Sequence, residues 1–204
     1  MKTYDITAPT PQGPAPRDQQ TFLQGLDFHE AAVRSAITQT DGYGAPTVAL
    51  CPMIVCFAFA IELYFKSLIT TGAKGHGLDV LFQKLSSPIQ KKIQKAYKSR
   101  TGRNHKALEG DLQKLAGAFA DWRYIFEGEG QQIYTNLLAA LTKSIAETAI
   151  SIKPGWPGAP HHRRQLERLM VAETELIMTV KNLGGGTFVS FVDGTGGKLN
   201  TPEA

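Results

Sequence analysis

The chain has 204 residues, which is enough for one domain of ordinary size with a substantial core. Its composition is globular, with 42% hydrophobic and 20% charged residues, and a net charge of +4 permits an anionic partner such as RNA without requiring one. The N-terminus is polar and Pro-rich, unlike a signal peptide, so we expect a cytoplasmic protein.

Residues 1–20 contain four prolines and few large apolar side chains, which predicts a disordered or extended arm. Apolar residues at helical spacing then predict a first helix from about Asp18 to Thr40. His29 lies near the apolar stripe of this helix, and we interpret it as a core-edge histidine with a satisfied hydrogen bond. The stripe consists of Phe22, Leu26, His29, Val33, Ala36 and Ile37.

The most apolar stretch of the chain covers residues 47–71. Pro52 either lies in the first turn of a helix there or kinks a longer one. About 14 residues precede Glu62, against the roughly 20 that cross a membrane, so we expect a buried central helix and no membrane partner. Cys51 and Cys56 fall on different faces of this helix, and we expect two buried, unpaired thiols.

The remaining chain alternates amphipathic stretches with breaks. Helical spacing predicts elements at 75–86, at 88–99, from about Glu109 to the break at Gly128, at 131–152 and at 161–182. We expect a polar loop over 100–110 and a strand only at 187–192. The chain is therefore expected to be all-α: an up-and-down helical bundle of five to seven helices over 21–152, followed over 153–204 by a Pro/Gly linker, an additional helix and a short irregular or β appendage.

One charged cluster is expected at the end of the central helix. Glu62 and Lys66 stand four residues apart in the favourable order, as a structural ion pair in preference to a catalytic one. His76 fits a capping or core-edge group, and also a general acid or base. Arg123 and Glu127 can pair, or hold an acidic ligand. We expect Glu62, Lys66, His76 and Arg123 to converge, with Glu62 within ion-pair range of Lys66 or Arg123.

The densest basic tract is either a solvated helix face or a surface that contacts phosphates. Its residues are Lys91, Lys92, Lys95, Lys98, Arg100, Arg103, His105 and Lys106. A second group, His161 to Arg164, places positive charge at a helix start, against the helix dipole. The sequence has no metal-ligand pattern, phosphate loop or dinucleotide fingerprint, so we expect no cofactor and no metal.

Three segments in series resemble the HEPN superfamily of small bacterial and archaeal helical domains. They are AFAIELYFKSLI (58–69), GHGLDVLFQKLS (75–86) and FADWRYIFE (119–127). The resemblance implies an up-and-down bundle that forms a homodimer and works in toxin–antitoxin, phage-defence or RNA-processing systems. Active members cut RNA without a metal, using an Arg and a His a few positions later.

The resemblance implies a degenerate or altered nuclease site here. Glu127 stands where the histidine belongs in the helix that carries Arg123, whereas Arg100 and His105 have the spacing but lie in the predicted loop. We therefore favour an RNA- or protein-interaction module, with RNA or a nucleotidyltransferase-type antitoxin as partner. One alternative is a metal-independent endoribonuclease, in which Arg123 or Arg103 stabilises the phosphate and His105 or His76 transfers protons. Another is a helical protein that binds a small molecule or nucleotide beside Glu62, Lys66, His76 and Arg123.

Overall fold

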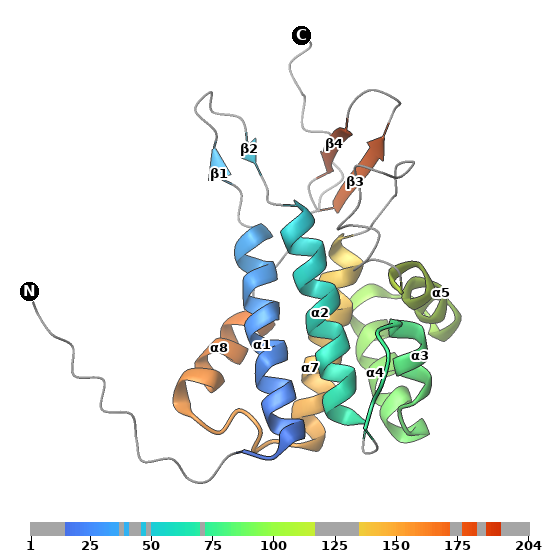
Figure 1. Ribbon diagram of the computed structural model, residues 1–204. Helices are drawn as coiled ribbons and strands as arrows, with labels where there is room; N and C mark the ends of the chain where they lie inside the picture. Colours follow the sequence, from blue (N-terminus) through green and yellow to red (C-terminus); the bar gives the residue numbers. More distant parts are fainter. Residues whose placement is uncertain are drawn as a thin grey trace, which may run out of the picture.

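The protein is a helical bundle with two short β-hairpins at one end (Figure 1). The computed structural model describes residues 15–36, 39–40, 46–47, 50–69, 72–116, 135–171, 177–182 and 187–192. Seven helices lie in this described part, which confirms the expected all-α bundle of five to seven helices. They are α1 (Arg17–Ala36), α2 (Leu50–Leu68), α3 (Leu78–Gln83), α4 (Ser87–Thr101), α5 (His105–Leu115), α7 (Thr135–Ile152) and α8 (Pro160–Val171).

The helix α2 is the centre of the bundle, as its composition predicts. It packs against α1, α7 and α3, while α8 covers the outer side of α1 and α4 packs against α7 (Figure 1). Its side chains Phe57, Ile61 and Phe65 are buried, because apolar residues surround this helix axis. Pro52 lies in the first turn, where its missing N–H costs no hydrogen bond.

An 18-residue window of α2, Cys51–Leu68, is long and apolar enough to cross a membrane, and 61% of it is buried inside the bundle. The sequence-based count of about 14 residues was therefore too short, because Glu62 and Lys66 do not end the apolar window. Burial of this kind is what a core helix shows. Cys51 and Cys56 are unpaired, as expected, but only partly buried, which corrects the prediction that both are buried.

The helices α1 and α2 approach closely at Gly25. A Cβ atom at this position would lie 2.8 Å from two ring carbons of Tyr64, closer than real Cβ contacts. The absent side chain lets the buried Tyr64 ring lie against α1, where it also packs on Phe22 with ring centroids 5.3 Å apart. α1 begins at Arg17, so residues 17–20 belong to this packed helix and not to the predicted arm.

The turns around α4 are set by capping residues. Ser86 occupies the N-cap position of α4 without a side-chain hydrogen bond to the helix, and Pro88 lies in the first turn. Gly102 ends the helix in the left-handed conformation at φ 69°. Asn104 caps α5 by accepting a hydrogen bond from the Ala107 backbone N–H at 3.0 Å. α5 therefore starts at His105, and the predicted polar loop over 100–110 shrinks to three residues.

Two corrections concern strands. The predicted helix at 161–182 ends at Val171, and residues 177–182 form strand β3, which pairs antiparallel with β4, the predicted strand at 187–192. The first helix ends at Ala36 instead of Thr40, since Gln39–Thr40 (β1) pairs with Pro46–Thr47 (β2). The strands are β3 (Ile177–Asn182) and β4 (Thr187–Val192), with Ile177 opposite Val192.

Candidate functional site

The charged end of α2 carries the cluster that the sequence predicts. Glu62 Oε1 accepts a hydrogen bond from Lys66 Nζ at 2.7 Å and lies 3.0 Å from His76 Nδ1. The Glu62 side chain is only 6% exposed, Lys66 is 20% exposed, and His76 is 74% exposed. The expected convergence of these three residues is confirmed, whereas Arg123 and Glu127 lie outside the described residues.

Local geometry explains why His76 reaches Glu62 from fourteen residues away. Gly75 has φ 97°, a conformation that other residues rarely adopt, and this turn directs the chain along α2 before α3 begins at Leu78. We expected His76 to lie at the start of the third helix. It instead lies two residues before α3 begins. One buried carboxylate oxygen is shared by an ammonium group and an imidazole, so the Glu62 charge is compensated on the outer side of α2.

The exposed side of α4 carries a basic surface. The helix contains five basic residues and no acidic residue. Ile93 and Tyr97 face the core, which leaves Lys91, Lys92 and Lys95 exposed; we call these three residues the α4 lysine face. Within the described residues no carboxylate lies within ion-pair distance of them or of Lys106 on α5. Like charges three or four residues apart on a helix repel each other.

The predicted arginines Arg100 and Arg103 are held by carboxylates. Arg100 Nη2 lies 2.7 Å from Glu147 Oε2 and joins α4 to α7. Arg103 binds Asp111 in a bidentate fork at 2.9 Å and 2.7 Å. Asp111, which is buried, also accepts a hydrogen bond from the Tyr97 hydroxyl at 2.7 Å. Burial first, and then the bond to Asp111, raise the pKa of Tyr97 well above its usual range.

The Tyr97–Asp111–Arg103 cluster was missed from the sequence, although a signal was present. Asp111 lies on the same side of α5 as Leu108, Leu112 and Leu115, so its carboxylate interrupts an apolar stripe. A carboxylate in such a position requires a buried partner. This cluster holds the turn between α4 and α5. The role of Arg103 that the structure supports is therefore structural.

His105, the candidate proton-transfer residue, lies at the start of α5 with its side chain 55% exposed. Its contacts in the described chain are Gln94 Nε2, 3.2 Å from Nδ1, and Glu109 Oε1, 3.6 Å from Nε2. Neither partner is an arginine. The geometry that the ribonuclease alternative needs, a histidine in hydrogen-bond reach of an arginine, is therefore not formed by His105 in the described part.

His29 is a second polar residue whose position differs from the prediction. It is fully buried, not at the core edge, with Nδ1 3.2 Å from the Tyr64 hydroxyl. Its Nε2 atom is buried without a hydrogen-bond partner, so the expected satisfied histidine is half satisfied. Burial, and then the positive charge of Lys143, lower the pKa of His29 to about 3. His29 is thus a neutral core residue at physiological pH.

The remaining predicted group, His161 to Arg164, forms the first turn of α8. The rings of His161 and His162 lie 3.9 Å apart, and burial, followed by the charge of His161, lowers the pKa of His162. Across the described residues, no group of three or more His, Cys, Asp or Glu side chains comes together as a metal site would require.

Comparisons with known proteins give no neighbour from which a function could be transferred. No protein-family model, no curated protein and no solved structure matches this chain.

Proposed function

We propose that the chain is a HEPN-like helical module that binds RNA through its phosphates without cutting it, in a defence or toxin–antitoxin type system. The observation that carries this proposal is the α4 lysine face. Lys91, Lys92 and Lys95 are exposed on a helix with no acidic residue, and no described carboxylate compensates them.

A polyanion is the partner that such a surface fits. Lysines at this spacing repel each other, and a nucleic-acid backbone removes the repulsion while it releases its own condensed counterions. Lys106 adds a further exposed charge on α5. Tyr97, the aromatic residue among the α4 lysines, is buried, so base stacking is not part of the proposed binding mode. Recognition of shape and phosphates in structured RNA follows.

The absence of cutting is supported by the state of the arginines and of His105. Arg100 and Arg103 are neutralised by Glu147 and Asp111, and His105 contacts Gln94 and Glu109. Cleavage requires a free cation that stabilises the phosphate in the transition state. It also requires a proton-transfer group of suitable pKa beside that phosphate. The glutamate that stands at position 127 in the HEPN-like segment agrees with a site that has lost its histidine.

The test is fluorescence anisotropy with a labelled RNA hairpin, in EDTA, at salt concentrations from 50 to 300 mM. We expect binding that weakens steeply with salt. Replacing Lys91, Lys92 and Lys95 together with glutamine should lower the slope of log K against log salt by about 2 to 3. The control replaces Lys114, Arg163 and Arg164, which are exposed on other helices, and removes the same charge.

Three results would contradict the proposal. Equal losses in both triple variants would show that net charge binds RNA without a defined face. An absence of salt-dependent binding would leave a protein-interaction role. Cleavage of the hairpin in EDTA that is abolished by His105→Ala would establish the ribonuclease alternative instead.

A further inference from the structure

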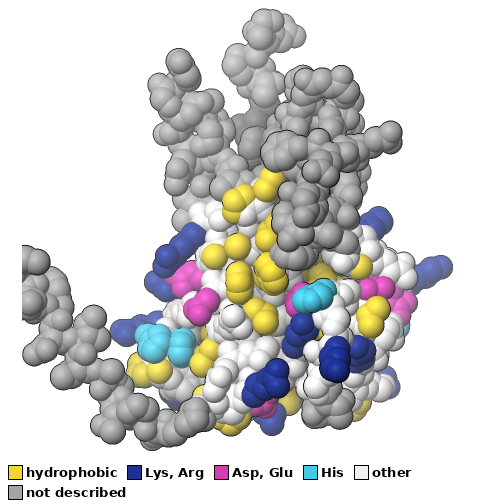
Figure 2. Space-filling model, in the orientation of Figure 1, with side chains coloured by type: hydrophobic (Ala, Val, Ile, Leu, Met, Phe, Trp, Pro, Cys, Tyr) yellow, Lys and Arg dark blue, Asp and Glu magenta, His cyan; other side chains and the backbone are white. Residues whose placement is uncertain are grey.

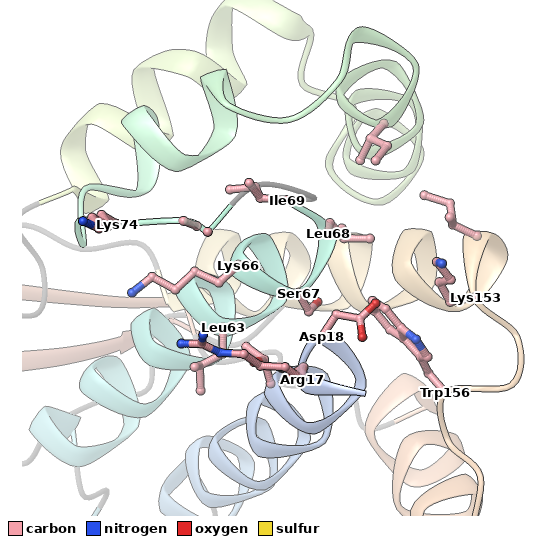
Figure 3. Close-up of a pocket in the computed structure, with 15 residues that line it drawn as sticks. Arg17, Asp18, Leu63, Lys66, Ser67, Leu68, Ile69, Lys74, Lys153 and Trp156 are labelled. Carbon is pink, nitrogen blue, oxygen red and sulfur yellow. Dashed lines mark hydrogen bonds between the residues drawn. The ribbon is translucent and has the colours of Figure 1, made fainter. Parts of the chain in front are cut away.

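A pocket of about 830 Å³ opens at the end of the bundle where α1 begins and α2 ends (Figure 3). Its walls come from the first turn of α1, the last turn of α2, the segment at residues 72–74, the start of α4 and the end of α7. A volume of this size is typical of sites for small molecules and cofactors.

The pocket has an excess of positive charge. Among its described lining residues, four are basic and one carries a carboxylate. The basic residues are Arg17, Lys66, Lys74 and Lys153, and the acidic one is Asp18. In Figure 3 the charged ends of Arg17, Lys66 and Lys74 lie on the same side of the pocket. Lys66 is paired with Glu62, whereas the charged groups of Arg17, Lys74 and Lys153 have no carboxylate within ion-pair distance in the described chain. Figure 2 shows basic side chains gathered around this lower end of the bundle.

The rest of the lining is apolar and held in place. Leu68 and Trp156 are buried, and Ile89 and Ile152 are partly buried. The Trp156 ring packs on Phe22 with centroids 5.2 Å apart, and the Trp156 carbonyl accepts a hydrogen bond from Gln19 at 3.0 Å. The apolar wall therefore exists before any ligand arrives, and binding has little ordering to do.

We propose that this pocket binds a small molecule that joins an anionic group to a flat apolar body, a build that nucleoside phosphates have. The anionic group lies against Arg17, Lys66 and Lys74, where it supplies the negative charge that Arg17 and Lys74 lack. The apolar body lies against Leu68, Ile89 and Trp156. The site goes beyond the proposed binding of RNA, because it includes none of the three residues of the α4 lysine face.

The test is isothermal titration calorimetry of the full chain with two probes of this build, ATP and 8-anilinonaphthalene-1-sulfonate. Pyrophosphate, which has only the anionic part, and adenosine, which has only the flat part, are titrated for comparison. We expect saturable binding of one or both probes, and binding of pyrophosphate and adenosine at least about tenfold weaker, because each offers half of the contacts. Arg17→Gln and Lys74→Gln should each weaken the bound probe about fivefold or more. Lys114→Gln, an exposed charge outside the pocket, is the matched control.

A further variant tests the apolar wall. Ile89→Glu places a carboxylate in the first turn of α4, where the helix dipole favours it, so the fold should persist as measured by circular dichroism. The probe should no longer bind, because the new charge repels it. The proposal is wrong if neither probe binds, if Arg17→Gln and Lys74→Gln bind the probe like the control, or if pyrophosphate binds as tightly as the probe that binds.

Discussion

The buried histidine His29 makes the stability of the fold depend on pH in a way that can be calculated. Its pKa is about 3 in the folded chain, against 6.5 for a free side chain, because burial and the Lys143 charge oppose protonation. Below pH 6.5 the unfolded chain binds a proton that the folded chain does not bind. The contribution of His29 to the free energy of unfolding is therefore constant above pH 6.5 and decreases as the pH falls towards 3.

The size of the loss follows from the two pKa values. Between pH 7.5 and pH 5 it amounts to about 2 kcal/mol, and the full shift corresponds to about 5 kcal/mol at pH values below 3. A loss of 2 kcal/mol is a large share of the stability of an ordinary domain. Carboxylates also titrate in this range, so the His29 contribution has to be isolated by a variant that lacks it.

The variant is the double substitution His29→Phe with Tyr64→Phe. It removes both partners of the buried hydrogen bond and the unpartnered Nε2 atom, and leaves no buried polar group unpaired there. Urea denaturation at pH 7.5 and pH 5 gives the free energy of unfolding of both chains. We expect the wild type to lose about 2 kcal/mol more than the variant. In parallel, the His29 ring signals in NMR spectra should not titrate between pH 8 and pH 4.5. Equal losses in the two chains, or a His29 signal that titrates near pH 6.5, would refute the reasoning.

Two matched pairs of substitutions test the packing around α2, each by urea denaturation at pH 7.5. Lys66→Gln leaves the buried Glu62 with an exposed histidine as its partner and should lower the free energy of unfolding by about 2 kcal/mol. The control is Arg34→Gln, which breaks an ion pair of the same spacing and the same 2.7 Å distance. Because 71% of the Arg34 side chain is exposed, this change should cost about 0.5 kcal/mol or less. Equal costs would show that burial does not decide the strength of these pairs. Gly25→Ala forces a methyl group against the buried Tyr64 ring and should destabilise the fold by about 1–2 kcal/mol after the gain in helix propensity. The control is Gly110→Ala in the interior of α5, where an added Cβ would meet no atom within 4 Å beyond its own helix backbone. This change should stabilise the fold by about 1 kcal/mol. A stabilising Gly25→Ala would contradict the close approach of α1 and α2.

The sequence predicts best where local spacing decides the structure. Leu78, Leu81, Phe82 and Leu85 are all buried, because their spacing in the sequence places them on one side of the third helix and the turn after it. The Glu62–Lys66 pair follows from the same rule. The approach of His76 is less local, yet the glycines on both sides of it indicate a tight turn back towards α2.

The sequence predicts least where a distant partner decides. Residues 177–182 carry Ile177 and Val180 at helical spacing, and the strand forms because β4 lies opposite, beyond a Gly-rich turn. His29 was placed at the core edge, since periodicity locates its helix face but not Phe57 and Tyr64 of α2, whose rings pack against it. The start of α5 was placed too late, because residues 100–110 were interpreted as a polar loop and the cap at Asn104 was not recognised.

The two proposed anion sites differ in chemistry, and this difference decides what each can bind. The α4 lysine face offers charge alone, so it holds a ligand only through many phosphates at once, and added salt competes with every contact. The pocket at the end of α2 sets its cations beside an apolar wall that includes Trp156, so part of its binding free energy comes from surface removed from water and does not depend on salt. A long anion therefore fits the helix face, and a short anion with an apolar body fits the pocket. α4 contributes to both sites, with its exposed lysines to the helix face and with Ile89 to the lining of the pocket.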